Sequence, residues 1–466
     1  MKDSAKKDFL ITDMHIDAIV AEIGSTTTIL NAFAGLSDKP RFIGQGQAPT
    51  TVLFGDVCIG LFEARKDLMN NLGVSELTYD TMLATGSAAG GLKMSVHGLM
   101  HDMTVHAAKS AALGAGAIVV NTTSGKLDEY DIDDILDCRA NLILIAGGTD
   151  FGERETALQN MRRIAEAGIK TPVIYCGNVQ NHSAIKRICG DYGIPLRITE
   201  NVYPRLDTLN IEPVRRCIHD MFEEHITRAP GMERIREMVD GHILPTPGSV
   251  MEASMLLYDM LGDVCVIDIG GATTDVHSVT EGSDEIAQLM TVPEPFAKRT
   301  VEGDLGLYVN AGNLVSCIGK DKLNRELEVS VDEVMSRYKP IPDTPEQFLL
   351  TERLCLEAGL LAISRHAGQL KHLYTPQGRQ TIALGKDLTS LKYLVGTGGA
   401  LTRLPGRERI MRQLADCRIN NLMLYPNPGA LKVLHDNDYI MASLGVLSLR
   451  YREAAMSLLS DSLRRA

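Results

Sequence analysis

Two short segments, one in each half of the chain, carry the same order of residue types and could bind phosphate. Each begins with an apolar run, continues with an acidic residue, an isoleucine and a glycine, and ends in small hydroxyl residues. The first contributes Glu22, Gly24, Ser25, Thr26 and Thr27, and the second contributes Asp268, Gly270, Gly271, Thr273 and Thr274. Because the pattern is repeated, it is far more specific than a single copy would be.

The chemistry of these residue types is that of a phosphate clamp. Glycine lets backbone N–H groups approach a phosphate chain closely, and hydroxyl groups donate further hydrogen bonds. An acidic residue at the end of a strand can hold Mg²⁺ directly or through water. We therefore expect two facing turns around the triphosphate of ATP, with Glu22 and Asp268 as catalytic residues and magnesium ligands.

A third glycine-rich turn, at residues 395–400, follows another apolar run. Its glycines, Gly396, Gly398 and Gly399, would let an adenosine moiety lie against the backbone. Other phosphate motifs fail. The segment 124–126 resembles the end of a P-loop, but Val120 stands where that motif needs its first glycine. No dinucleotide fingerprint follows a predicted strand, which disfavours a dinucleotide-dependent enzyme.

Three histidines and one acidic run offer weaker signals. His97, His101 and His106 could present two metal ligands on one helix, but no Cys or acidic ligand accompanies them at a suitable spacing. A partly exposed helix face is the favoured interpretation. The acidic run at residues 128–134 more plausibly caps and charges the start of a helix at Ile132 than binds a cation.

A charged segment follows the second candidate turn. Lys298, Arg299, Glu302 and Asp304 could contact phosphate or orient a water molecule in a closed cleft, or they could form a salt-bridged loop. The sequence leaves these two interpretations equal.

The composition restricts the class of protein. The formal charge of −12, without clustered Lys and Arg, argues against nucleic-acid binding. The nine cysteines are scattered singly and without a CxxC pair, which is typical of reduced thiols in a cytoplasmic protein. No apolar run is long enough to span a membrane, and no signal peptide is recognisable.

The pattern of apolar runs predicts an α/β fold with an insertion. Strand–turn units are expected at residues 17–34, 263–280 and 391–403. Between the first two, strands at 115–121, 142–147, 172–177 and 196–199 alternate with helices at 151–167 and 184–190, which implies a parallel sheet. Helices are also expected at 249–261, 346–373 and 438–463. The predicted domains are a first lobe (1–94), an inserted Rossmann-like domain (95–245) and a second lobe (246–466).

At the repeated turns the sequence resembles the actin–sugar kinase–Hsp70 ATPase superfamily, which implies an actin-like (ribonuclease H-like) two-lobed ATPase. More narrowly, it resembles the MutL/GlmL family of glutamate mutase accessory proteins, which is unrelated to the mismatch-repair protein of the same name. The resemblance runs from about residue 17 to 450. Besides the three turns, it is carried by residues 87–94, 107–116, 146–150, 176–178, 201–204, 245–248 and 293–306.

The resemblance implies a partner and cofactors. Members of this family accompany adenosylcobalamin-dependent mutases and aminomutases, and are thought to use ATP and Mg²⁺ to eject damaged cobalamin. The chain would then be a reactivating chaperone with slow, partner-stimulated ATPase activity. One departure concerns Glu22, because the superfamily usually carries Asp there; this puts fast hydrolysis in doubt more than ATP binding.

Two alternatives stay open. A small-molecule kinase of the same superfamily would need a general base, for which Asp304 is the only candidate. A nucleotide-gated binding protein without hydrolysis would fit the departure at Glu22.

Overall fold

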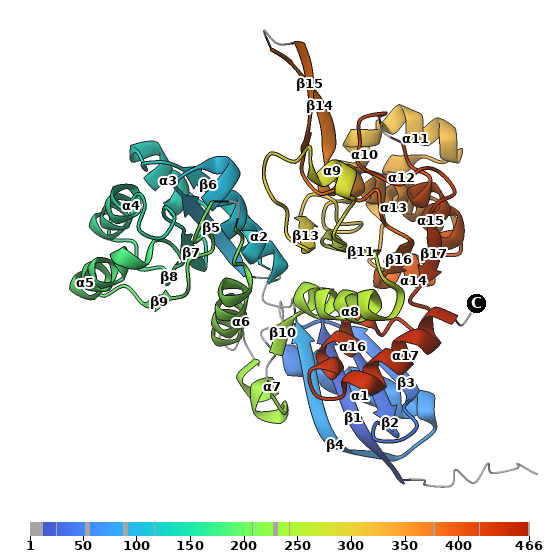
Figure 1. Ribbon diagram of the computed structural model, residues 1–466. Helices are drawn as coiled ribbons and strands as arrows, with labels where there is room; N and C mark the ends of the chain where they lie inside the picture. Colours follow the sequence, from blue (N-terminus) through green and yellow to red (C-terminus); the bar gives the residue numbers. More distant parts are fainter. Residues whose placement is uncertain are drawn as a thin grey trace, which may run out of the picture.

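A computed structural model describes residues 13–24, 26–51, 56–86, 92–115, 117–206, 208–226, 232–241, 243–375, 378–418 and 420–464. Within them the strands form three five-stranded sheets and one two-stranded ribbon. Figure 1 shows two lobes placed one above the other, with a further α/β domain beside them. No helix of the described residues is long and apolar enough to cross a bilayer.

The first lobe is built on a mixed sheet of order β10-β4-β1-β2-β3. Its strands are β1 (Asp13–Ile23), β2 (Thr27–Ala34), β3 (Arg41–Pro49), β4 (Glu76–Gly86) and β10 (Ile243–Pro245), with helices α1 (Val57–Leu72) and α7 (Met232–Met238). The first three strands form an antiparallel meander, whereas β4 and β10 run parallel to β1. Helix α1 packs on this meander and buries Leu61, Ala64 and Leu68.

The second lobe repeats this topology, with the order β13-β12-β11-β16-β17. Its strands are β11 (Val264–Ile269), β12 (Thr274–Val279), β13 (Ala297–Glu302), β16 (Tyr393–Thr397) and β17 (Lys432–His435). Again the first three strands are antiparallel, and the last two are parallel to the first. Two such sheets in one chain make the fold actin-like (ribonuclease H-like), as the sequence predicts.

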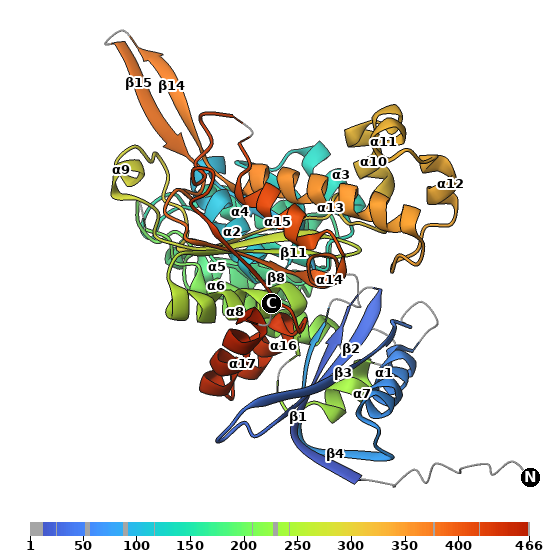
Figure 2. The same cartoon turned by 90° about the vertical axis from the view of Figure 1, so that its right-hand side faces the viewer.

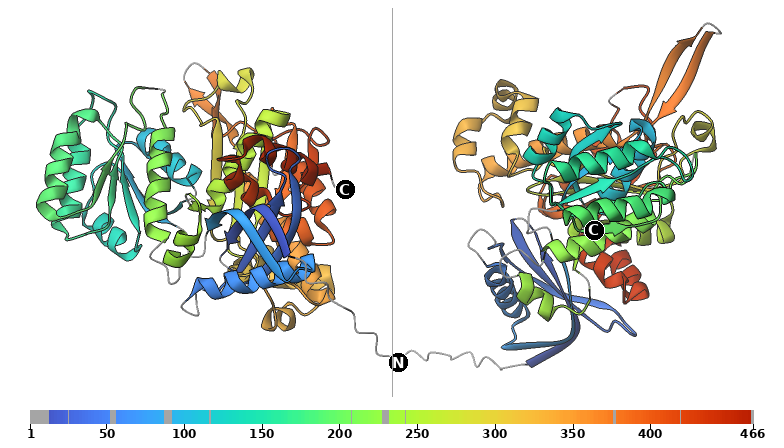
Figure 3. Two further views of the ribbon diagram at one scale, coloured as in Figure 1. Left: turned by 90° about the horizontal axis from the view of Figure 1, so that it is seen from below. Right: turned by 90° about the vertical axis from the view of Figure 1, so that its left-hand side faces the viewer.

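The inserted domain is a Rossmann-like α/β unit, whose five parallel strands follow the order β6-β5-β7-β8-β9. The strands are β5 (Lys93–Gly98), β6 (Ile118–Ser124), β7 (Leu142–Ile145), β8 (Val173–Tyr175) and β9 (Leu196–Ile198). The helices are the π-helical η2 (His101–Val105), α2 (His106–Gly114), α3 (Glu129–Asp137), α4 (Glu155–Glu166), α5 (His182–Tyr192) and α6 (Glu212–Ile226), and η3 (Val179–Asn181) is a 3₁₀ turn. Figure 3 shows this domain standing to one side of both lobes.

Strand pairing shifts the domain limits relative to the sequence. Strand β5 begins at Lys93 and already belongs to the inserted sheet, whereas β10 pairs with β4 of the first lobe. We therefore propose domain boundaries near residues 92 and 242.

Three helices lie between the sheets of the two lobes (Figure 1). They are α8 (Thr246–Leu261), α16 (Met441–Ser448) and α17 (Arg452–Arg464). One apolar cluster joins buried residues of α8 and α16 to Val20 of β1 and to Val266 of β11. Helix α16 therefore packs on the first lobe, against β1 and β4, as well as on α8. Burial of this shared core holds the two lobes together.

The remaining helices also belong to the second lobe. They are α9 (Asp284–Ala287), α10 (Ala311–Ile318), α11 (Lys320–Leu327), α12 (Val331–Ser336), α13 (Pro345–His366), α14 (Gly398–Arg403) and α15 (Arg407–Ala415). The ribbon of β14 (Gln369–Thr375) and β15 (Gly378–Leu384) projects away from this lobe (Figure 2).

Two predicted elements need correction or adjustment. The helix predicted at 346–373 is wrong beyond His366, because Ala367 is extended and Gly368 N–H donates to Lys386 O at 2.7 Å, which starts the β14–β15 pairing. The acidic run does cap a helix, as predicted, but three residues earlier: Asp128 is the N-cap of α3 and forms a capping box with Asp131.

Candidate nucleotide site

The first turn joins β1 to β2. Glu22 lies in the last part of β1 and is 7% exposed. Gly24 N–H then donates to Thr27 O at 3.0 Å, which closes the turn. A Cβ on Gly24 would lie 2.7 Å from that same oxygen, so glycine is required here. Ser25 lies outside the described residues.

The second turn joins β11 to β12 with the same geometry. Gly270 N–H donates to Thr273 O at 3.0 Å, and Asp268 lies at the end of β11 as Glu22 does at the end of β1. Behind the turn, the Thr274 hydroxyl donates to Leu305 O at 2.9 Å. These contacts hold the second turn rigidly over the following loop.

The two turns face each other across the cleft. A Cβ built on Gly271 would lie 3.5 Å from Thr26 Oγ1, so the turns from separate lobes are in near contact. Glu22 and Asp268 are also close enough to interact electrostatically: after burial, the charge of Asp268 is the largest cause of the raised pKa of Glu22. The structure therefore brings together the two segments that the sequence singles out.

The third turn lies against the second. It joins β16 to α14, and Gly398 has a φ of 83°. A Cβ on Gly398 would lie 2.4 Å from Asp268 Oδ1 and 2.6 Å from Ile269 O, whereas Gly399 has open space around its Cβ position. Gly396 packs its backbone against Met411, whose Sδ would be 2.9 Å from a Cβ. Glycine at 398 thus permits the close approach of β16 to β11.

The acidic groups in the cleft resist ionisation. Burial, followed by the nearby charges of Asp268 and Asp436, raises the pKa of Glu22 to about 8. Burial and the charge of Asp275 raise the pKa of Asp268 to about 7. Glu22 Oε2 has no hydrogen-bond partner among the described residues. A buried carboxyl with an unused oxygen beside a second carboxyl fits a divalent cation, which would supply the missing positive charge.

The carboxylates alone do not enclose a metal. Within the described residues no three His, Cys, Asp or Glu side chains are grouped closely enough to hold an ion. This arrangement fits Mg²⁺, which keeps several waters and uses one or two carboxylates together with phosphate oxygens.

Sequence reasoning missed two residues of the cleft. Asp436 follows β17, accepts from Thr397 Oγ1 at 3.0 Å, and caps α16 by accepting from Met441 N–H at 2.9 Å. Its position just after an apolar strand repeats the signal of Glu22 and Asp268, and could have revealed it. Arg403 ends α14 near Glu22, and its positive charge partly offsets the burial and the acidic neighbours that raise the pKa of that carboxyl. Nothing in the local sequence marks Arg403.

Arg403 also connects the lobes. Its guanidinium donates to Gln47 Oε1 at 2.6 Å and to Gln45 in β3, and its Cζ lies 5.4 Å from the ring centroid of Tyr439. Arg403 thus joins α14 of the second lobe to β3 of the first.

Comparison with known proteins establishes the family. The chain matches the family described as "MutL protein" over residues 18–463. The chain belongs to this family. A curated relative, Protein MutL of Clostridium tetanomorphum, is 36% identical over 445 residues, which cover 92% of this chain and 95% of the relative. The family membership that the sequence predicts is thereby confirmed.

Solved structures are similar only at low levels. Nucleotide-free acetone carboxylase shares 13% identity and a TM-score of 0.36 over 93% of this chain and 70% of that one. Component A of (R)-2-hydroxyglutaryl-CoA dehydratase from Acidaminococcus fermentans shares 9% identity and a TM-score of 0.32 over 94% of this chain and 99% of that one. Xylulose kinase from Bifidobacterium adolescentis shares 13% identity and a TM-score of 0.29 over 96% of this chain and 93% of that one. The actin-like assignment therefore rests on strand order.

In this MutL-family protein the three histidines do not gather. His97 is buried in β5 and not on a helix face, which corrects the prediction for this residue. Its two ring nitrogens contact Ser95 Oγ at 2.9 Å and Thr123 Oγ1 at 2.7 Å, and burial lowers its pKa to about 4. His101 is exposed on η2, and His106 contacts Glu294.

The charged segment after the second turn is ion-paired. Arg365 donates to both oxygens of Asp304, at 2.8 and 3.0 Å, and to Glu302 at 2.6 Å. The hydrogen bond from Arg365 lowers the pKa of Asp304. Of the two interpretations left open by the sequence, the structure favours the salt-bridged one.

Proposed function

We propose that this protein is an ATP-dependent reactivating chaperone of an adenosylcobalamin-dependent mutase or aminomutase. Its family and its actin-like fold support an ATP-dependent accessory role. The observation that carries the proposal is the near contact of the first and second turns, with Glu22 buried and Asp268 half-buried beneath them. Such a pair of turns from separate lobes suits a triphosphate bound between the lobes.

Each part of the cleft would have its own role. Backbone N–H groups and hydroxyls of the first turn (Gly24 to Thr27) and the second turn (Gly270, Gly271 and Thr273) would bind phosphate. Thr274, predicted with them, would instead support the second turn from behind, because its buried hydroxyl donates to Leu305 O. Glu22 and Asp268 would hold Mg²⁺ through water. Gly396, Gly398 and Gly399 would lie beside the adenosine. Bound Mg-ATP supplies binding and hydrolysis energy, which the lobes would convert into release of damaged cobalamin by the partner.

The pKa values suggest how the site takes up its cation. With a pKa of about 8, Glu22 would be mostly protonated near neutral pH in the free protein, and Asp268, with a pKa of about 7, would be partly protonated. A divalent cation would displace these protons, because it stabilises the ionised form of both groups. The chain would thus avoid paired buried charges until its ligand arrives.

The test is Mg-ATP hydrolysis by the purified protein, alone and with a candidate mutase loaded with cyanocobalamin. We expect a low basal rate that rises with the loaded mutase, together with release of cyanocobalamin. A rate that no cobalamin enzyme changes, but that a small metabolite raises, would instead identify a kinase.

A non-hydrolysing, nucleotide-gated binding protein is the second candidate. The longer side chain of Glu22 and its pKa of about 8 favour it, because a protonated carboxyl is a poor magnesium ligand. The kinase has less support, since Arg365 occupies both oxygens of the candidate base Asp304. ATP binding without ADP formation over many hours, with the mutase present, would select the second candidate.

A further inference from the structure

Arg299 is a charged side chain in an unusual place. It is 2% exposed, in β13, and is among the largest fully buried side chains of the described residues. A buried guanidinium loses much hydration energy and is rarely retained without several strong partners. Its position therefore asks for an explanation beyond packing.

The partners of Arg299 belong to two different domains. Nη2 donates to Asp275 Oδ1 at 3.2 Å, within the second sheet, and Nη1 donates to Leu113 O at 2.9 Å, in the inserted domain. Nε has no partner among the described residues. Leu113 lies in the last turn of α2, where a carbonyl lacks a helical partner and the helix dipole favours a cation. One long ion pair and one carbonyl contact make a weak stabiliser but a specific connection.

Asp275 leads from Arg299 into the candidate nucleotide site. Asp275 and Asp268 are directly opposite each other on β12 and β11, so their side chains share one face of the sheet. The hydroxyl of Thr273, in the second turn, donates to Asp275 Oδ2 at 3.4 Å. A continuous path thus runs from Thr273 through Asp275 and Arg299 to α2.

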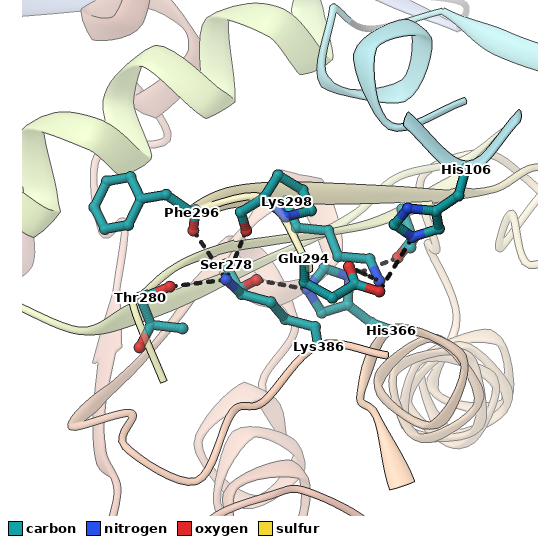
Figure 4. A network of polar contacts seen from close by, with 10 residues as sticks. His106, Ser278, Thr280, Glu294, Phe296, Lys298, His366 and Lys386 are labelled. Carbon is teal, nitrogen blue, oxygen red and sulfur yellow. Dashed lines mark hydrogen bonds and ion pairs between the residues drawn. The ribbon is translucent and has the colours of Figure 1, made fainter. Parts of the chain in front are cut away.

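A second, separate contact holds the beginning of α2 (Figure 4). His106 Nε2 lies 3.1 Å from Glu294 Oε1, and Glu294 Oε2 lies 2.8 Å from Lys298 Nζ. Lys386 fastens the loop that carries Glu294 by donating to Pro295 O at 2.7 Å. This contact does not include a residue of the three turns, so α2 is tied at one end to the nucleotide site and at the other to a fixed loop.

We propose that Arg299 couples nucleotide binding to the position of the inserted domain, by transmitting displacement of the second turn to α2. The proposal rests on the proposed function, since it needs a nucleotide between the turns. It assigns Arg299 a positioning role for the inserted domain rather than a catalytic one.

The test is hydrogen exchange of the α2 backbone in the full-length protein, with and without saturating Mg²⁺ and a non-hydrolysable ATP analogue. In the unaltered protein we expect the analogue to slow exchange of residues 106–114 by about threefold or more. The double variant R299M/D275N removes the connection without leaving a buried unpaired charge, and should lose this difference while still binding the analogue.

Three further variants keep the test decisive. R299K retains the charge but replaces the guanidinium fork, whose two terminal nitrogens separately reach Asp275 and Leu113, with one ammonium, and should lose at least about half of the difference. E294Q loosens the other end of α2, so it should raise exchange in both states but keep the difference. R353M removes a half-buried arginine that pairs with Glu326 and Glu357, and should change nothing in α2.

Each outcome has a defined meaning. An analogue-dependent difference in α2 that persists in both R299M/D275N and R299K would overturn the coupling. So would analogue binding to the unaltered protein without a change in α2. Failure of the unaltered protein to bind the analogue at all would instead overturn the proposed function itself, and the coupling with it.

Discussion

The first hairpin, formed by β1 and β2, and the second hairpin, formed by β11 and β12, have the same topology but different side chains at equivalent positions. Strand register makes Glu22 equivalent to Asp268. The residue opposite is Ile29 in the first hairpin and Asp275 in the second. Two residues further along, the third strand carries Gln45 opposite Asn31 in the first hairpin and Arg299 opposite His277 in the second.

The difference separates two tasks. Beside Glu22 the first hairpin is neutral: Asn31 Nδ2 donates to Ser443 Oγ at 2.8 Å and Asn31 Oδ1 accepts from Gln45 at 2.8 Å, which fixes the sheet to α16. Beside Asp268 the second hairpin is charged and leads through Arg299 out of its own lobe. The first hairpin is held by neutral contacts to α16 and to Arg403, whereas the proposed coupling would make the second act on the inserted domain.

The largest expected effect is at Asp268. D268N should reduce ATP turnover by about 100-fold or more and leave nucleotide affinity within about tenfold, because it removes a charge that matters most in the transition state. E22Q should cost less, about tenfold, because it removes a charge that would hold Mg²⁺ only through water. Steady-state hydrolysis and equilibrium binding check both. Unchanged turnover in D268N would refute the role of Asp268.

The next effect is steric and lies beside the second hairpin. G398V should weaken nucleotide binding by about tenfold or more, because its Cβ would meet Asp268 and Ile269 at a backbone φ that valine rarely adopts. G399A is the matched control, since its Cβ has open space, and should bind nearly normally. Calorimetric titration with Mg-ATP compares them. Equal affinities would remove the third turn from the site.

A smaller effect concerns stability and pH at the other end of α2. Although burial opposes ionisation, the hydrogen bond from His106 and the charge of Lys298 lower the pKa of Glu294 to about 2, from an ordinary value of 4.5. The contribution is thus complete above pH 4.5 and is lost as the pH falls toward 2. E294Q should cost about 1–2 kcal/mol in urea unfolding at pH 7, and less as the pH falls below 4.5. A pH-independent difference would contradict this.

The smallest effect is expected at Asp304, the last residue of the charged segment that follows the second turn. D304N should leave ATP turnover within about twofold, because Arg365 already occupies the carboxylate and no proton is taken from a substrate. R365M, which frees Asp304, serves as the comparison. A loss of turnover of tenfold or more in D304N would revive the kinase interpretation.

How much the sequence predicts depends on the range of the contacts. The turns are local: glycine, hydroxyl and acid follow one another, so Gly24 and Gly270 could be recognised without a structure. The fold class followed because the same unit recurs, and it is confirmed. Assignment of the turn residues to nucleotide binding stays a prediction.

Long-range partners could not be predicted. Arg299 contacts Leu113, which lies 186 residues away, and Arg403 contacts Gln47, 356 residues away; neither distance leaves a trace in local patterning. The end of α13 was missed for another reason. The apolar residues after His366 suit a helix as well as a strand, and only pairing with β15 decides between them.

The attachment of the inserted domain has a mechanical consequence. Its chain leaves the first lobe after β4 and returns through β10. These strands are parallel neighbours, so both covalent connections of the inserted domain are to the first lobe. Through α2, however, it is fastened to the other. Because the domain is connected covalently to one lobe and through α2 to the other, a small movement of the lobes toward each other should rotate it. We expect the end of the domain far from the lobes to move through a larger arc than the lobes themselves. X-ray scattering with and without nucleotide would measure that arc.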